Sequence, residues 1–148
     1  MSDYSKYENI IKNARFNNNA SFLTEINNYS SSLGMKFYLD EIGPHTFLPF
    51  HSNLIGNPMV NALHGGVIAG LMENACIFHL LWELKINYFP RIVHISFDFL
   101  SPPKPMDTYA RVEINRKGRN IVNLTVKASQ PGNSKIIALG NGSYILNN

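Results

Sequence analysis

Glu73 is the only charged residue between His64 and Trp82, in a stretch made almost entirely of glycine, alanine, aliphatic and aromatic residues. A carboxylate among apolar neighbours is costly unless it is paired, hydrogen-bonded or neutralised. Burial of this kind raises the pKa of a carboxyl group and makes it a candidate for a functional site. Glu73 is therefore predicted to be a functional-site residue.

A His-Gly-Gly sequence, His64-Gly65-Gly66, opens the same stretch. Glycines leave backbone N–H groups unhindered, and the first amides of a helix have no partner within it. Glu73 follows about two helical turns later, so one helix is predicted to carry both an amide donor and a lone carboxylate. The alternative for His-Gly-Gly is a tight turn with a capping side chain. The alternative for Glu73 is a buried residue that Asn74 or a tyrosine hydroxyl satisfies.

The helix that holds these groups is predicted over residues 63–84, because the apolar segment is too long for a strand. Gly70 interrupts it at a cost of roughly 1 kcal/mol relative to alanine, which indicates that another element packs closely there. Apolar residues at helical spacing predict two earlier helices, over residues 4–14 and around residues 22–26.

Short runs over residues 35–39 and 46–50 flank Gly43-Pro44 and predict a hairpin. His45 and His51 lie there and are expected at the surface or at a strand edge.

The pattern changes to alternation after Pro90, and three further strands are predicted over residues 109–114, 121–128 and 136–146. One buried helix followed by an antiparallel meander defines an α+β domain, in which the sheet must curl around the helix. In the first strand, alternation predicts one face with Val93, Ile95, Phe97 and Phe99, and an opposite face with Ile92, His94, Ser96 and Asp98.

The composition predicts one globular domain: the chain has 148 residues, of which 45% are hydrophobic and 16% are charged. Cys76, the only cysteine, is expected to be a buried structural thiol, so no disulfide, Cys-based metal site or cofactor is expected. The net charge of +3 is scattered, which argues against nucleic acid as a partner. With charges interrupting the N-terminal segment and no long uninterrupted apolar run, we expect no membrane partner and a cytoplasmic location.

Several strings together resemble the PaaI-like acyl-CoA thioesterases of the hotdog-fold superfamily. The resemblance implies a hotdog fold, in which a curved antiparallel sheet wraps one long helix, with an N-terminal helical segment over residues 1–33 and the hotdog domain over residues 34–148. The matching strings are Gly56-Asn57-Pro58, Ala62 to Glu73, Phe97-Asp98-Phe99-Leu100-Ser101-Pro102, Lys117-Gly118-Arg119 and the closing strand from Ala138 to Ile145.

The activity that the resemblance implies is hydrolysis of an acyl-CoA thioester. Gly66 would donate its N–H to the developing oxyanion, beside Gly65, and Glu73 would attack the carbonyl or activate a water. His64 and Asn57 match positions that orient the substrate or water, and Asn61 is the substitute for Asn57. Family members act as dimers or dimers of dimers, and the donor and the carboxylate that face one substrate typically come from different subunits.

One position departs from the family pattern. Many relatives carry Ser or Thr where this chain has Ile92, and the hydroxyl positions the attacking water. His94, which is expected to point the same way as Ile92, is the predicted replacement, and Ser96 is the alternative. The rival function is therefore a catalytically weak acyl-CoA-binding hotdog protein. A hotdog hydratase would need a His-Phe-Pro-Gly-like segment, which His51-Ser52-Asn53 does not resemble.

The basic hairpin turn is the predicted contact for the CoA phosphates. Lys117 and Arg119 would bind them through charge-assisted hydrogen bonds, whereas the alternative is a solvated hairpin tip. The acyl group itself is not fixed by the sequence.

Overall fold

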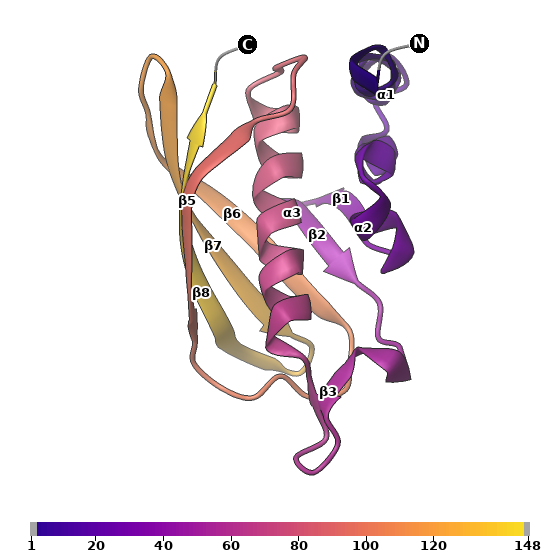
Figure 1. Ribbon diagram of the computed structural model, residues 1–148, viewed down its shortest axis with the longest axis vertical. Coiled ribbons are helices and arrows are strands. Elements are labelled where there is room, and N and C mark those ends of the chain that lie inside the picture. The colour runs from indigo at the N-terminus through magenta and orange to yellow at the C-terminus, as the bar shows by residue number, and fades with distance from the viewer. Residues whose placement is uncertain (1–2, 147–148) are drawn as a thin grey trace.

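The computed structural model describes residues 3–146 as a six-stranded sheet, a two-stranded ribbon, one long helix and a helical N-terminal segment (Figure 1). The helical elements are α1 (Asp3–Phe16), η1 (Ala20–Ile26), α2 (Asn28–Ser32), η2 (Ser52–Leu54) and α3 (Gly65–Glu83). The strands are β1 (Lys36–Asp40), β2 (Gly43–Leu48), β3 (Ile55–Asn57), β4 (Ala62–Leu63), β5 (Arg91–Phe99), β6 (Thr108–Lys117), β7 (Ile121–Gln130) and β8 (Asn133–Ile145).

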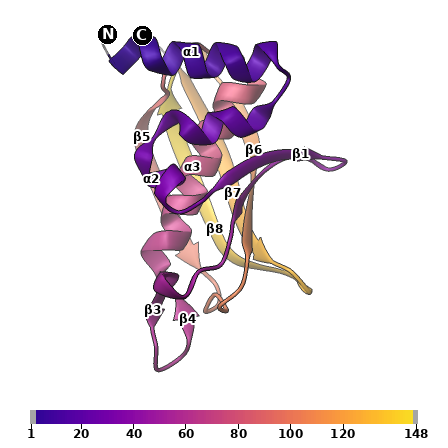
Figure 2. The same ribbon diagram turned by 90° about the vertical axis from the view of Figure 1, so that its right-hand side faces the viewer.

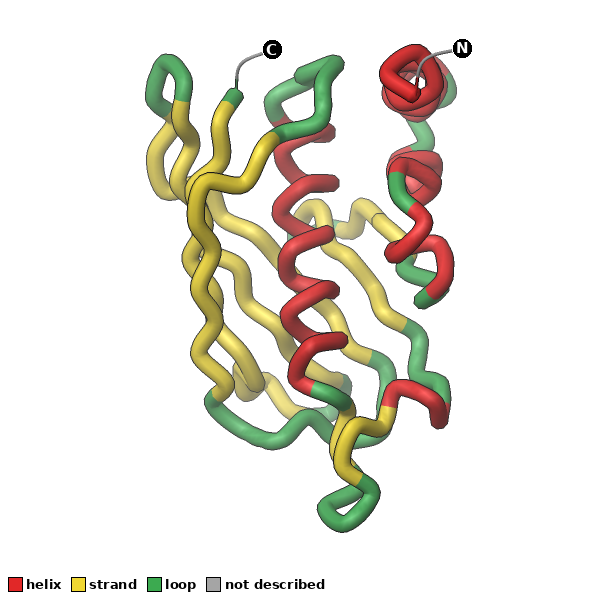
Figure 3. The backbone as a smooth tube through the Cα atoms, in the orientation of Figure 1, coloured by secondary structure: helices red, strands yellow, loops and turns green. Residues whose placement is uncertain are grey.

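The six-stranded sheet is antiparallel throughout and has the order β1-β2-β6-β7-β8-β5. Helix α3 lies along its concave face, and the N-terminal helices lie on the other side of α3 (Figures 1 and 2). Figure 3 shows the single long helix crossing the strands that curve around it. This is the predicted hotdog arrangement, which the structure confirms.

Helix α3 supplies the centre of the hydrophobic core. Leu71, Met72 and Phe78 are fully buried, and Ile11 and Leu23 of the N-terminal segment belong to the same core. By length and hydropathy α3 would suffice to cross a membrane, but 61% of its apolar window is buried inside the protein, which is the environment of a core helix.

Strand β5 differs from the predicted alternation because it contains a β-bulge. Ile92 pairs with Tyr144 and His94 pairs with Ser143, so Val93 is an extra residue in the ladder. Residues directly opposite each other share a face. Ile92 therefore lies on the helix side with the buried Tyr144, whereas His94 lies on the outer face, and the prediction that the two point the same way was wrong.

The N-terminal segment is more finely divided than predicted. Residues 20–26 form a 3-10 helix, and Asn27 then starts α2 by accepting a hydrogen bond from Ser30 N–H at 2.8 Å. This cap places α2 against α3, with Tyr29 of α2 at Gly70.

His45 is 9% exposed, so the expectation of a surface histidine was wrong, whereas His51 is exposed as expected. The rings of Tyr38 and Tyr109 lie beside His45 and help to cover it.

Candidate active site

The start of α3 is fixed by His64, which is its N-cap residue. Its Nδ1 accepts a hydrogen bond from Gly66 N–H at 2.9 Å, and its carbonyl accepts from Val67 N–H. Gly56 lies directly against this imidazole, because a Cβ placed at Gly56 would be 2.5 Å from the Cβ of His64. The string from Gly56 to Gly66 therefore builds one compact turn around His64.

The capping bond changes which amide is available to a ligand. Gly66 N–H was the predicted oxyanion donor, but it already donates to His64. Gly65 is the first residue of α3, and within residues 3–146 its N–H has no hydrogen-bond acceptor. Gly65 is half-buried, and the nearest side chain to a Cβ placed there is the ring of Phe99, at 3.6 Å. Gly65 is thus the unoccupied donor at this helix end.

Glu73 lies on the side of α3 that borders a groove of about 700 Å³. Burial raises the pKa of this carboxyl above its ordinary value of 4.5. In the part of the chain that the structure describes, no hydrogen bond or ion pair reaches the carboxylate. Asn74 does not satisfy it: its amide donates to Gly70 carbonyl and accepts from Asn27, both at 2.8 Å. The lone-carboxylate interpretation therefore holds.

The groove is lined by α3, by the N-terminal segment and by the start of β5. Its polar side chains other than Glu73 are two asparagines bonded to each other, one arginine and one tyrosine, and the rest of its lining is apolar or glycine. The lining residues are Asn27, Tyr29, Gly66, Ala69, Gly70, Glu73, Asn74, Ile77, Phe89, Pro90, Arg91 and Ile92. A carboxylate in an apolar groove of this size matches the general form of a small-molecule site.

Ile92 reaches the groove and His94 does not. The bulge at Val93 places Ile92 beside Glu73 in the lining and turns His94 to the outer face of the sheet. His94 therefore cannot replace a hydroxyl at position 92 within this chain.

Asn57 and Asn61 lie in the ribbon formed by β3 and β4, outside the groove. Asn57 Oδ1 accepts from Met59 N–H at 3.1 Å, and Asn61 has a left-handed φ of 45°. Asn57 is thus bonded within the turn, Asn61 forms part of the turn through its left-handed backbone, and neither lines the groove of Glu73 in a single chain.

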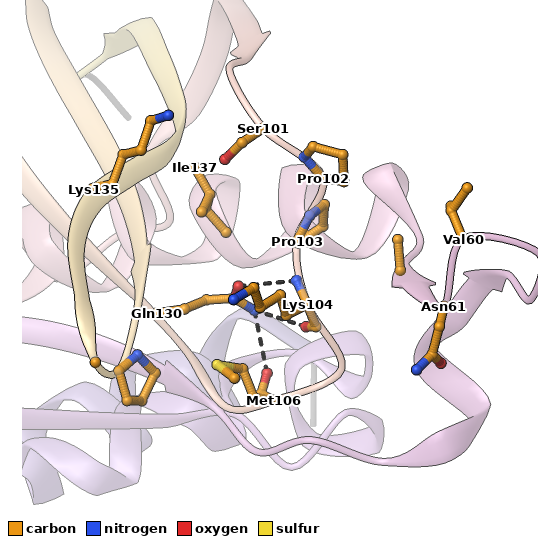
Figure 4. A pocket seen from close by; sticks show the side chains of 13 residues that line it. Val60, Asn61, Ser101, Pro102, Pro103, Lys104, Met106, Gln130, Lys135 and Ile137 are labelled. Atoms are coloured by element: carbon orange, nitrogen blue, oxygen red, sulfur yellow. Dashed lines mark hydrogen bonds between the residues drawn. The ribbon is translucent and has the colours of Figure 1, made fainter.

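A second pocket of about 420 Å³ lies beside this ribbon and includes Asn61 (Figure 4). Gln130 crosses its floor, donating to Lys104 carbonyl at 2.8 Å and accepting from Lys104 N–H at 3.0 Å. Its lining includes Lys135 but no carboxylate, so it offers no counterpart to Glu73.

Lys117 and Arg119 are exposed at the hairpin between β6 and β7. Figure 1 shows this hairpin at the end of the sheet opposite to the N-terminus of α3. A shallow depression of about 380 Å³ at the hairpin includes Arg116 and Arg119, but it shares no residue with the groove. In one chain the structure does not bring this basic turn to Glu73.

Cys76 is not a competing nucleophile. It is fully buried, as predicted, and burial raises the pKa of its thiol to about 12. Residues 3–146 also hold no cluster of three or more His, Cys, Asp or Glu side chains that could bind a metal ion.

Sequence reasoning missed Tyr29 and Asn27 as neighbours of the site. The available signal was Gly70, which indicated a close packing partner without identifying it. The partner is the ring of Tyr29: a Cβ at Gly70 would lie 2.6 Å from Tyr29 Cε1.

The fold and the groove define a hotdog protein whose apolar central helix carries a lone carboxylate, and comparisons with known proteins agree. The family model described as Acyl-CoA thioesterase N-terminal domain matches residues 55–144, so the chain belongs to this acyl-CoA thioesterase family. No curated protein sequence matches significantly.

Solved structures show the same fold. A Chromobacterium violaceum protein has 29% sequence identity and a TM-score of 0.76, covering 93% of this chain and 96% of its own. A Bacillus halodurans protein solved with CoA has 18% identity and a TM-score of 0.71, covering 100% and 96%. A variant of the phenylacetic acid degradation protein PaaI from Thermus thermophilus has 16% identity and a TM-score of 0.67, covering 80% and 98%.

Proposed function

We propose that the protein hydrolyses acyl-CoA thioesters to a free acid and CoA. The observation that carries the proposal is the Glu73 carboxylate, which has a raised pKa and no partner among residues 3–146. It lies in an apolar groove, on the helix whose first amide also has no acceptor among these residues. Membership of the acyl-CoA thioesterase family and the CoA bound by the Bacillus halodurans neighbour support this substrate class.

In the proposed reaction Glu73 removes a proton from a water, which attacks the thioester carbonyl carbon. The carbonyl oxygen becomes an oxyanion and accepts a hydrogen bond from Gly65 N–H, where the helix dipole also favours negative charge. Collapse of the intermediate breaks the C–S bond, and the proton held by Glu73 passes to the CoA thiolate. Direct attack by Glu73 through an anhydride is the other route open to an unpaired carboxylate.

The two groups that face one carbonyl belong to different subunits in this proposal. Gly65 and Glu73 are eight residues apart, which is about 12 Å along a helix. Such a separation along one helix agrees with the family resemblance, in which the amide donor and the carboxylate that face one substrate come from different subunits.

We propose a homodimer, or a dimer of dimers, joined through β5, the strand at the sheet edge beside the groove. This strand presents partly exposed apolar side chains at Ile92, Val93 and Phe99. An unpaired apolar edge of this kind favours pairing with a second copy.

The test is release of free thiol from a panel of short, medium, long and aryl acyl-CoAs. We expect turnover by the wild type and loss of about 10²-fold or more in kcat for Glu73→Gln, because the general base is removed. Glu83→Gln is the matched control, since Glu83 is an exposed carboxylate at the end of the same helix. Absence of thiol release from every acyl-CoA would refute the proposal.

The second candidate is an acyl-CoA-binding protein with little turnover, favoured by Ile92 in the groove. Isoleucine offers no hydrogen bond to a water beside Glu73. Acyl-CoA binding without thiol release would select this function.

A further inference from the structure

Tyr29 brings a hydroxyl group from the N-terminal segment into the groove of Glu73. The hydroxyl end of its ring lies close against α3 at Gly70, where a Cβ would be 2.6 Å from Cε1 and 2.7 Å from the phenol oxygen. Gly70 is one turn after Gly66 and three residues before Glu73, so all of them share one face of the helix. The phenol oxygen therefore belongs to the lining of the groove, on the helix face that carries Glu73.

The backbone on both sides of Tyr29 is anchored. Asn27 donates to Asn74 Oδ1 at 2.8 Å, and Asn74 in turn donates to Gly70 carbonyl at 2.8 Å. Ser30 is fully buried, and its hydroxyl donates to Thr24 carbonyl at 2.8 Å. The Asn27 bond ties the start of α2 to the turn of α3 that contains Glu73, and the Ser30 bond ties α2 to η1, so the position of Tyr29 is set by the fold.

The groove needs a second group to hold a water. A water that gives one proton to Glu73 is free to turn unless its other proton also has an acceptor. Asn27 and Asn74 are bonded to each other, and Ile92 is apolar. Tyr29 is the only hydroxyl among the residues that line the groove, and within residues 3–146 its phenol oxygen has no hydrogen-bond partner.

We infer that Tyr29 is a positioning residue, whose phenol oxygen accepts a hydrogen bond from the attacking water while Glu73 accepts the other. The two bonds aim the lone pair of the water at the thioester carbonyl. Ile92, which lines the same groove, offers the water no hydrogen bond. The O–H of Tyr29 is satisfied by solvent, since the residue is 46% exposed. This inference rests on the proposed thioesterase function, and it gives the N-terminal segment a part in the reaction.

The first test is Tyr29→Phe, which deletes one oxygen and keeps the ring on Gly70. We expect kcat to fall about tenfold, the factor that corresponds to one hydrogen bond of ordinary strength, with KM and the thermal midpoint unchanged. Tyr38→Phe is the matched control, because Tyr38 is 44% exposed on β1 and does not line the groove. An unchanged kcat, a change in KM alone, or an equal loss in Tyr38→Phe would overturn the inference.

The second test is Gly70→Ala, which keeps the phenol but displaces it, because the new methyl group would overlap the ring. We expect the same loss of kcat, and no further loss in the Tyr29→Phe/Gly70→Ala double variant. Ile92→Thr should restore turnover to Tyr29→Phe by supplying another oxygen. Full activity of Gly70→Ala, or additive losses in the double variant, would count against the inference.

The two proposals fail in distinguishable ways. A wild type that releases no thiol from any acyl-CoA overturns the thioesterase function and the role of Tyr29 together. An active wild type with an equally active Tyr29→Phe variant overturns the role of Tyr29 alone.

Discussion

Replacement of Gly65 by proline should abolish most of the activity without unfolding the protein. Proline lacks the N–H group, so Gly65→Pro deletes the unoccupied amide at the start of α3. Proline is also well tolerated at the first position of a helix, because that N–H has no helical acceptor.

The local geometry accepts this substitution. His64 has φ −65° and ψ 131°, an extended conformation that suits a residue before proline. A Cβ at position 65 would lie 3.6 Å from the Phe99 ring, which is an ordinary van der Waals contact. The capping bond from Gly66 to His64 does not involve the deleted group. The thermal midpoint should therefore stay close to that of the wild type.

The expected kinetic loss is large because an oxyanion donor acts mainly in the transition state. Loss of one such donor lowers kcat by about 10²- to 10³-fold, or about 2.7–4 kcal/mol. The assay is thiol release from the best acyl-CoA substrate, with circular dichroism and thermal unfolding as measures of folding. Gly65→Ala keeps the N–H and is the matched control.

Retained activity in Gly65→Pro, at the level of Gly65→Ala, would refute the assignment. The donor to the oxyanion would then be the N–H of Gly66, the residue predicted from the sequence. That outcome would require His64 to release the Gly66 amide when substrate binds.

Three further predictions test the base, the groove and the core. Because burial raises the pKa of Glu73, the unfolded chain loses this proton at lower pH than the folded chain does. The unfolding free energy of the wild type should therefore fall relative to that of Glu73→Gln as pH rises above about 4.5, and kcat should rise with pH over the same range. Parallel stability curves for the two proteins would refute the burial argument. Ile92→Thr should raise kcat by about 10²-fold at similar KM if water positioning limits the wild type, and a slower variant would place Ile92 in the acyl pocket. Gly140→Ala should lower the free energy of unfolding, measured by chemical denaturation, by about 1–3 kcal/mol, because its Cβ would lie 2.8 Å from Val126 and 3.1 Å from Met72. An unchanged free energy of unfolding would mean that these side chains move aside at no cost.

Much of the fold followed from the sequence because apolar periodicity reports directly on burial. The central helix was predicted over residues 63–84 and is observed as Gly65–Glu83. The lone carboxylate was visible because one charge in an apolar helix has few structural explanations.

The errors arose where one residue or one hydrogen bond changes the geometry. Alternation cannot reveal a bulge, so the single extra residue Val93 moved Ile92 and His94 to opposite faces. The pattern His-Gly-Gly did not show which glycine amide the histidine would cap. Gly70 indicated a close neighbour, but the identity of Tyr29 depended on how a distant segment folds back.

The separation between Gly65 and Glu73 ties the chemistry to assembly. Both groups are present in one chain, about 12 Å apart along the helix, and in the proposed reaction they come from different subunits. The groove beside Glu73 is bordered by β5, whose edge is unpaired in the single chain. The exposure of Ile92 at 39% and Phe99 at 53%, costly in an isolated subunit, is explained if a second copy covers them and brings its own Gly65 to the groove. In the dimer that we propose, each chain contributes part of each site, and the β5 edge is the surface through which the two chains join.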